Sequence, residues 1–407
     1  RVVRAGRRAA PAPLDDSGGG HWEGSCRAKS RAARSCRVGA MRLLHFADLH
    51  LDTPFRWAPP QLARARRAGL RATLGRIVEL ARDQRVDALT CGGDLYEQER
   101  VTPDTVAYLQ STFASLDPVP VLLAPGNHDW LGPDSPYARA AWSPNVHIFT
   151  RDRLTPYELA DGCTVWGAAH RAPANTAGFL DDFAVPGSGV HIGVFHASQV
   201  EWPAGQPAGQ VPHAPFHAEQ ITRAGLTHAL LGHFHTPRDT ATHTYPGNPD
   251  PLTFGETGRR GAVLLTVSES GQIRTERYDV ATAAVHDLTV DVTGASHADE
   301  VRQQVLAAVE GLTGAVRVTL TGELGDEVDL RLDLLAAACP PWLDVLVPRV
   351  GVLRPGYDLQ ALAGQPTVRG QFVRDVLAAD LDDDQRRRVL VTGLRALDGR
   401  ADELDVA

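Results

Sequence analysis

Short apolar runs alternate with helical stretches from Met41 to about Asp279, and this alternation restricts the fold more than any other feature of the sequence. Amphipathic stretches lie at about 60–85 and in the segment PDTVAYLQSTFASL. The apolar runs read as strands, several of them buried on both faces: RLLHFA, VDALTC, VPVLLA, VWGAA, VHIGVFH, THALLG and GAVLLTV. Strands that alternate with helices predict an α/β domain over residues 41–280.

Two further regions follow this domain. Apolar residues alternate near 288–292 and 316–320 and show helical spacing near 301–309, which predicts a small α/β domain over residues 285–350. Residues 351–407 read as two amphipathic helices. Their apolar stripes either pack on the chain's own body or bind a partner.

The first forty residues differ in composition from the rest of the chain. They hold eight Arg, one Lys and three acidic residues, a net charge of +6, whereas the remaining residues carry −14. We interpret residues 1–40 as a disordered extension, or as upstream sequence translated by mistake with Met41 as the true start. The alternative is a basic nucleic-acid arm or a transit peptide.

Composition narrows the class of protein further. No apolar run approaches the roughly 18–20 residues that span a bilayer, so we expect no membrane association. Beyond residue 40 the cysteines are Cys91, Cys163 and Cys339, too widely spaced for a disulfide framework or a C-x-x-C site. We therefore expect a cytoplasmic protein. The net charge of −8 argues mildly against a nucleic-acid partner.

Polar residues recur where the apolar runs end. Residues i and i+2 of an extended chain point to the same side, so pairs with this spacing can aim two side chains into one site. Glycines beside them allow sharp turns. The segments are HFADLHLD with Asp48 and His50, CGGDLYE with Asp94, PGNHD with Asn127 and His128, GVFHAS with His196, and LGHFHTP with His233 and His235.

These residue types are metal donors. Apart from His128, two Asp, one Asn and four His combine hard oxygen with borderline nitrogen, a mixture that suits Mn²⁺, Fe²⁺ or Zn²⁺ better than Ca²⁺ or Mg²⁺. They are too many for one ion and enough for two, if one carboxylate bridges. A lone histidine at a strand end is usually structural. Five such segments in this order instead favour a two-metal site.

The same motifs resemble those of the calcineurin-like metallophosphoesterases, and within that superfamily the bacterial DNA-repair exonucleases of the SbcD and YhaO type. The closer likeness rests on HFADLHLDTPF, LLGHFH, YPGNPDPLTFGETGRRG and TVRGQFVRDVL. The resemblance implies a four-layer α/β/β/α sandwich, a small α/β capping domain and a helical C-terminal tail that engages an SMC-like ATPase of the SbcC or YhaN type.

The resemblance also implies a role for each residue. Asp48, His50 and His235 would hold one metal, and Asn127, His196 and His233 the other. Asp94 would bridge the two ions, most simply Mn²⁺. His128 would assist the leaving oxygen and Asp129 would orient His128. Glu97 stands where some nucleases of this group carry a His or an Asp, and its role stays open.

Several basic and aromatic residues have weaker assignments. Arg56 and Trp57 either line the groove or belong to a plain exposed loop. The Arg64, Arg66, Arg67 and Arg71 cluster makes one helix basic, which a solvated face explains best. Arg259 and Arg260 are candidates for contacts with backbone phosphates.

Three functions compete. The first is a two-metal phosphodiesterase that degrades DNA ends in repair, with single-strand endonuclease activity as an additional option, in a nucleoid-associated protein for which a homodimer is compatible. The second is a metallophosphoesterase for a small phosphodiester or nucleotide, which the acidic body favours because DNA binding needs positive charge. The third, a scaffold without catalysis, is disfavoured because all ligand positions are present.

Overall fold

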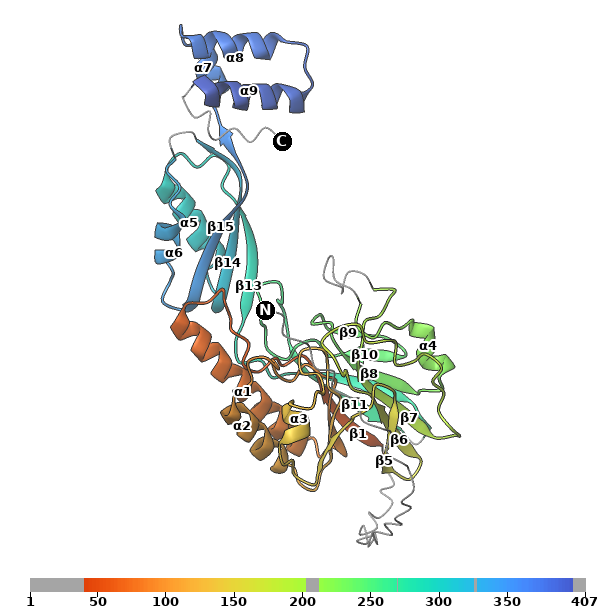
Figure 1. The fold of residues 1–407 in the computed structure, drawn as a ribbon. Helices are drawn as coiled ribbons and strands as arrows, with labels where there is room; N and C mark the ends of the chain where they lie inside the picture. The colour runs from red at the N-terminus through yellow and green to blue at the C-terminus, as the bar shows by residue number, and fades with distance from the viewer. Residues whose placement is uncertain (1–39, 203–211, 269, 326–327, 398–407) are drawn as a thin grey trace, which may run out of the picture. The chain divides into compact units, whose positions relative to one another are not determined.

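The computed structural model describes residues 40–202, 212–268, 270–325 and 328–397 (Figure 1). The expectations for residues 1–39 therefore lie outside the described residues. No helix in the described part of the chain is both long and apolar enough to cross a membrane.

A mixed six-stranded sheet carries the first half of the site. Strands β1 to β4 pair in parallel, whereas β11 and β12 run antiparallel at one edge. Leu74, Ile77 and Phe113 of helices α1 and α2 pack on this sheet. The elements are β1 (Met41–Phe46), α1 (Pro60–Asp83), β2 (Ala88–Cys91), α2 (Pro103–Ala114), β3 (Val121–Leu123), α3 (Pro136–Arg139), β4 (Val146–Ile148), β11 (Gly261–Val267) and β12 (Ile273–Asp279).

A second mixed six-stranded sheet faces the first. Strands β6, β7, β8 and β10 are parallel, and β5 and β9 are antiparallel edge strands. One buried cluster joins Leu43 and Leu122 of the first sheet to Ile192 and Leu230 of the second. The elements are β5 (Thr155–Ala160), β6 (Cys163–Gly167), β7 (Val190–His196), α4 (Ala218–Arg223), β8 (His228–Gly232), β9 (Arg238–Asp239) and β10 (His243–Tyr245). The predicted α/β class is confirmed.

The C-terminal third contains a small parallel sheet and a helical segment, each with its own apolar cluster. The sheet has the order β13-β14-β15. The elements are β13 (Val285–Asp291), α5 (Ala298–Ala308), β14 (Gly314–Gly325), α6 (Leu332–Ala337), β15 (Leu343–Gly356), α7 (Leu359–Ala363), α8 (Val368–Ala378) and α9 (Asp383–Leu397). Helix α7 is an addition to the two helices that the sequence predicts there.

The basic face of α1 differs from the expectation at one residue. Arg66 is 4% exposed, and its guanidinium donates to Asp250 Oδ1 at 2.8 Å. The other oxygen of Asp250 accepts from the Thr73 hydroxyl at 2.8 Å and from the Thr282 backbone N–H at 2.7 Å. Arg66 therefore belongs to a buried network that ties α1 to the segment before β13, because a charge can be buried only if it is paired.

Removing the carboxylate of this network should be costly. Asp250→Ala leaves the Arg66 guanidinium buried and unpaired, so we expect the free energy of unfolding to fall by about 3–5 kcal/mol. The control is Asp104→Ala, whose partner Arg71 is partly exposed and whose own side chain is 78% exposed, with an expected loss of at most about 1 kcal/mol. Urea denaturation of both variants makes the comparison. Equal losses would contradict the role given to Asp250.

Candidate metal centre

The backbone at the predicted ligands is not extended. Asp48, His50, Asp94 and His233 have positive φ angles of 56°, 50°, 53° and 109°. Such angles are uncommon outside glycine and are retained mainly where the surroundings enforce them. The extended-chain argument for Asp48 and His50 is therefore wrong in its geometry: tight turns, not alternation along a strand, bring their side chains together.

Two glycines make room for these turns. Gly93 has φ of +100°, a conformation that an L side chain rarely adopts. At Gly126, a Cβ atom would lie 2.3 Å from Asp94 Oδ1 and 2.7 Å from the Asp94 backbone N. Any side chain at Gly126 would therefore push Asp94 out of position.

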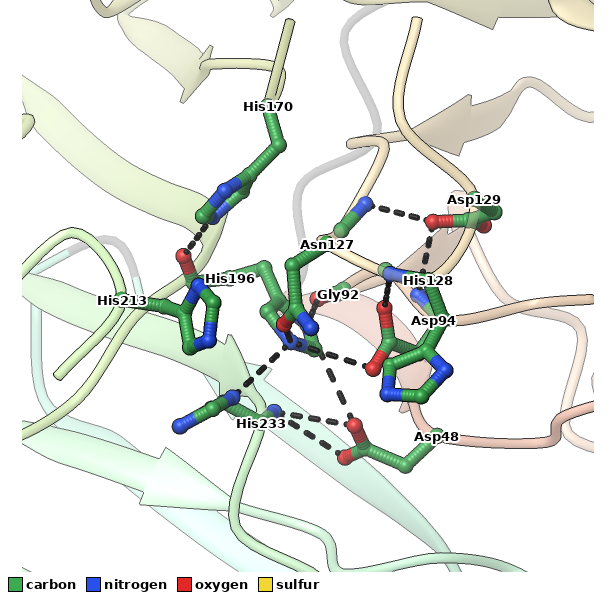
Figure 2. Close-up of polar contacts among 12 residues, drawn as sticks. Asp48, Gly92, Asp94, Asn127, His128, Asp129, His170, His196, His213 and His233 are labelled. Atoms are coloured by element: carbon green, nitrogen blue, oxygen red, sulfur yellow. Dashed lines mark hydrogen bonds and ion pairs between the residues drawn. The ribbon is translucent and has the colours of Figure 1, made fainter. Parts of the chain in front are cut away.

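The buried carboxylate of Asp129 fixes two of the loops to each other (Figure 2). It accepts hydrogen bonds from the backbone N–H groups of Gly126 at 2.6 Å, Asp94 at 3.0 Å and Leu95 at 2.8 Å, and from the Tyr137 hydroxyl at 2.6 Å. None of these contacts involves the His128 ring. This corrects the expectation that Asp129 orients His128, because Asp129 instead holds the loops that carry Asp94 and Asn127.

Three histidines are anchored through Nδ1, which leaves Nε2 for the centre. His50 Nδ1 contacts Glu97 at 2.8 Å, His196 Nδ1 donates to the Gly92 carbonyl at 2.9 Å, and His235 Nδ1 contacts Glu256 at 2.7 Å. Partners of this kind fix the ring and its tautomer in metal sites.

The free ends of the side chains converge. The Nε2 atoms of His50 and His235 lie 3.2 Å apart, and His196 Nε2 lies 2.9 Å from Asn127 Oδ1 and 3.3 Å from Asp94 Oδ2. The side chains form three groups, and within each group the donor atoms lie within 4.8 Å of one another. The groups are Asp48, His50 and His235; His50, Asp94 and His128; and Asp48, Asp94 and His196. Asp48, His50 and Asp94 are each shared by two of the groups.

This donor set fits divalent cations. The Nδ1 atom of His233 lies 3.2 Å from His196 Nε2, so this nitrogen faces the other donors (Figure 2). Carboxylate, amide and imidazole groups together suit Mn²⁺, Fe²⁺ and Zn²⁺. The residues thus form candidate His/Asp metal sites typical of a dimetal phosphoesterase.

Electrostatics separates the two aspartates. Burial raises the pKa of Asp48 above its usual range, despite the nearby His196. Burial acts in the same direction on Asp94, but His196, with His50 and His128, holds the pKa of Asp94 well below that of a free aspartate. Burial lowers the pKa of His196, but the Asp94 and Asp48 carboxylates raise it to about 9. Asp94 is thus the more firmly ionised of the two.

Glu97, whose role the sequence left open, joins two histidines. One carboxylate oxygen contacts His50 Nδ1 at 2.8 Å and the other contacts His128 Nδ1 at 3.0 Å. Burial raises the pKa of Glu97, but these two hydrogen bonds outweigh it and lower the pKa to about 2. For His128 burial acts in the opposite direction and lowers the pKa, but the hydrogen bond to Glu97 and the charge of Asp94 raise the pKa of His128 to about 9.

The loop after β10 supplies a support that sequence reasoning missed. Glu256 holds His235 and also accepts from Asn248 Nδ2 at 2.7 Å. Arg260 is 5% exposed and donates to the His235 carbonyl at 2.6 Å. Arg260 therefore stabilises the ligand loop and is not free for a phosphate. The expectation that Arg260 contacts a backbone phosphate is thus wrong. The motif YPGNPDPLTFGETGRRG was the signal for this network.

A pocket of about 670 Å³ opens onto the centre. Arg56 and Trp57 line it, as one of the two sequence interpretations proposed. Trp57 also has a structural part, since its indole N–H donates to the Leu252 carbonyl at 2.8 Å and its ring packs 4.6 Å from that of Phe254. Arg56 is exposed at the rim.

Residues 41–237 match the family model described as calcineurin-like phosphoesterase. This stretch contains every predicted ligand, from Asp48 to His235. Residues 41–237 therefore belong to the calcineurin-like metallophosphoesterase family.

Two relatives have been identified by sequence. The chain is 27% identical over 374 residues to a Bacillus subtilis protein described as uncharacterized metallophosphoesterase YhaO, an alignment that covers 87% of this chain and 84% of the relative. It is 25% identical over 301 residues to the DNA double-strand break repair protein Mre11 of Methanopyrus kandleri, which covers 65% of this chain and 62% of the relative. The chain is distantly related to both.

The Glu97 contacts can be tested directly. Glu97→Ala releases both His50 and His128, so we expect metal affinity or hydrolysis of a chromogenic phosphodiester to fall about 10–100-fold. Glu99→Ala is the matched control, because Glu99 is exposed and its side chain forms no hydrogen bond or ion pair with the described residues. Metal titration and turnover should be measured on each preparation. Wild-type behaviour of Glu97→Ala in both assays would rule out the positioning role.

Proposed function

We propose that the protein is a two-metal phosphodiesterase that degrades DNA ends, with single-strand endonuclease activity as an additional option. The observation that carries the phosphodiesterase part is the convergence of Asp48, Asp94 and four histidines, three of them with Nδ1 anchored, on one buried centre. In this proposal residues 41–280 form the nuclease domain as a four-layer α/β/β/α sandwich.

The proposed ligand roles are those that the family resemblance implies, and the clustering of the donors supports them. Asp48, His50 and His235 would hold one ion, Asn127, His196 and His233 the other, and Asp94 would bridge them. Mn²⁺ is our first choice, with Fe²⁺ and Zn²⁺ as alternatives for the same donors. Bound in this way, the ions would supply Lewis-acid polarisation of the phosphoryl oxygens.

His128 would act on the substrate. Its Nδ1 is occupied by Glu97, its side chain is 46% exposed, and it lines the pocket above the centre. With Nδ1 held, Nε2 is the atom available to hydrogen-bond the scissile phosphate and to pass a proton to the leaving oxygen. Glu97 would keep the ring in that orientation.

DNA as the substrate rests on two supports. One relative is named as a DNA double-strand break repair protein. The other support is the pocket rim, where the Arg56 cation and aromatic rings lie beside the centre, because phosphate contacts and base stacking are the usual means of holding a single strand. The acidic body favours the alternative, a small phosphodiester or nucleotide.

The C-terminal regions would serve the partner. We propose residues 285–350 as a capping domain and residues 351–407 as the docking element for an SMC-like ATPase. Apolar side chains remain exposed on the tail helices, among them Val368 at 73% and Leu377 at 43%. Exposed apolar surface of this kind commonly marks an interaction site.

The division of labour at the centre has a paired test. His128→Leu should keep the metal content and DNA binding of the wild type, while single-turnover cleavage of labelled duplex DNA falls about 10²–10⁴-fold, the usual worth of a general acid. His196→Ala should lose metal and cleavage together, because His196 would be a ligand.

Metal stoichiometry and cleavage should be measured on the same preparations, with a chromogenic diester alongside the DNA. Loss of an ion from His128→Leu would make His128 a ligand, as one of the donor groups allows. Wild-type turnover of the diester without any cleavage of DNA would favour the small-substrate alternative.

A further inference from the structure

A second, smaller pocket lies beside the metal pocket. It has a volume of about 260 Å³ and is lined by Asp52, Pro54, Arg67, Arg100 and Thr102. Pro54 lines both pockets. The two hollows are therefore adjacent and share Pro54 as a lining residue.

Two chain segments run from the metal centre into this pocket. The Thr53 N–H donates to the His50 carbonyl at 3.1 Å, and the Arg100 N–H donates to the Glu97 carbonyl at 2.9 Å. Each hydrogen bond closes a tight turn, so the Arg100 and Glu97 Cα atoms are separated by well under the roughly 11 Å that three extended residues would span. A DNA strand rises about 3.4 Å per nucleotide. The pocket thus lies within a few nucleotides of the centre.

The charges in the pocket favour an anion. Arg66 and Arg71 on the same helix are paired with Asp250 and Asp104, whereas neither Arg67 nor Arg100 forms an ion pair within the described residues. The only side-chain hydrogen bond of Arg67 to the described residues is a long one, 3.5 Å to the Pro54 carbonyl. Two guanidinium groups in one hollow that form no ion pair with a carboxylate are suited to bind a phosphate.

Asp52 cancels only one of these two positive charges. Its Oδ2 atom accepts from the Thr102 N–H at 3.1 Å and from the Thr105 hydroxyl at 2.7 Å, both at the start of α2. The carboxylate is therefore engaged by donors from α2 and is not paired with either arginine. The pocket keeps a formal charge of +1.

We propose that Arg67 and Arg100 form a subsite for a backbone phosphate of the DNA strand whose scissile phosphate lies at the metal centre. This inference rests on the proposed DNA substrate and adds the path of the strand, which would leave the centre over Pro54. A small diester bound at the centre alone would not need this subsite.

The test uses the full chain with Mn²⁺ and fluorescent phosphorothioate oligonucleotides, single-stranded and duplex, which keep the backbone charge and resist cleavage. For Arg67→Ala/Arg100→Ala we expect affinity to fall about tenfold or more. The slope of log K against log salt should decrease by about 0.7–0.9 for each lost contact. Turnover of a chromogenic diester should stay unchanged, which also shows that the variant is folded.

The matched control is Arg64→Ala/Arg223→Ala, which removes the same charge from two exposed positions outside the pocket. Arg67→Lys/Arg100→Lys should retain the salt slope of the wild type. If the pocket variant loses no more affinity or slope than the control, the subsite is overturned while the DNA substrate stands. If the wild type binds neither oligonucleotide, the proposed function fails and the subsite fails with it. Competition by inorganic phosphate alone, without an effect on DNA, would assign the pocket to a free anion and overturn the proposal.

Discussion

The carboxylate of Asp129 is the contact on which the centre depends. It is fully buried and accepts from three backbone N–H groups and the Tyr137 hydroxyl, so the loops after β2 and β3 cannot separate without leaving a buried charge unsatisfied. One of these loops presents Asp94 and the other presents Asn127 and His128. Asp129, which binds no metal in our proposal, thus sets the distance from Asp94, the proposed bridging ligand, to the loop that carries Asn127 and His128.

Hydrogen-bond acceptors around the histidines hold their rings in place, as Asp129 holds the loops. Glu97 holds the Nδ1 atoms of two histidines, the Gly92 carbonyl and Glu256 hold one each, and Arg260 stabilises the loop of Glu256. Positive φ angles at Asp48, His50, Asp94 and His233 show the cost of this convergence. The two packed sheets supply the rigid frame that maintains such a backbone, because strained conformations persist only where their surroundings over-determine them.

Sequence predicts the larger features of this molecule well, since burial periodicity is local. It identifies β1 to β3, β6 to β8, β11, α1 and α2, and it places Asp48 to His235 at strand ends. It fails where a contact is made through space. Asp129 and Glu97 are both acids near His128, and spacing could not tell which one reaches the ring. Arg66 reads as solvated because its partner, Asp250, lies 184 residues away. Short edge strands such as β9 have too few residues for a periodic signal.

Anomalous diffraction from Mn²⁺-loaded crystals would locate the ions directly. We propose two ions, bridged by Asp94 and held by six further side chains: Asp48, His50, Asn127, His196, His233 and His235. The account predicts two peaks about 3.5–4 Å apart inside the cluster. Each peak should contact Asp94, with His50 and His235 at one and His196 and His233 at the other. A single peak, or two peaks of which only one touches Asp94, would contradict it.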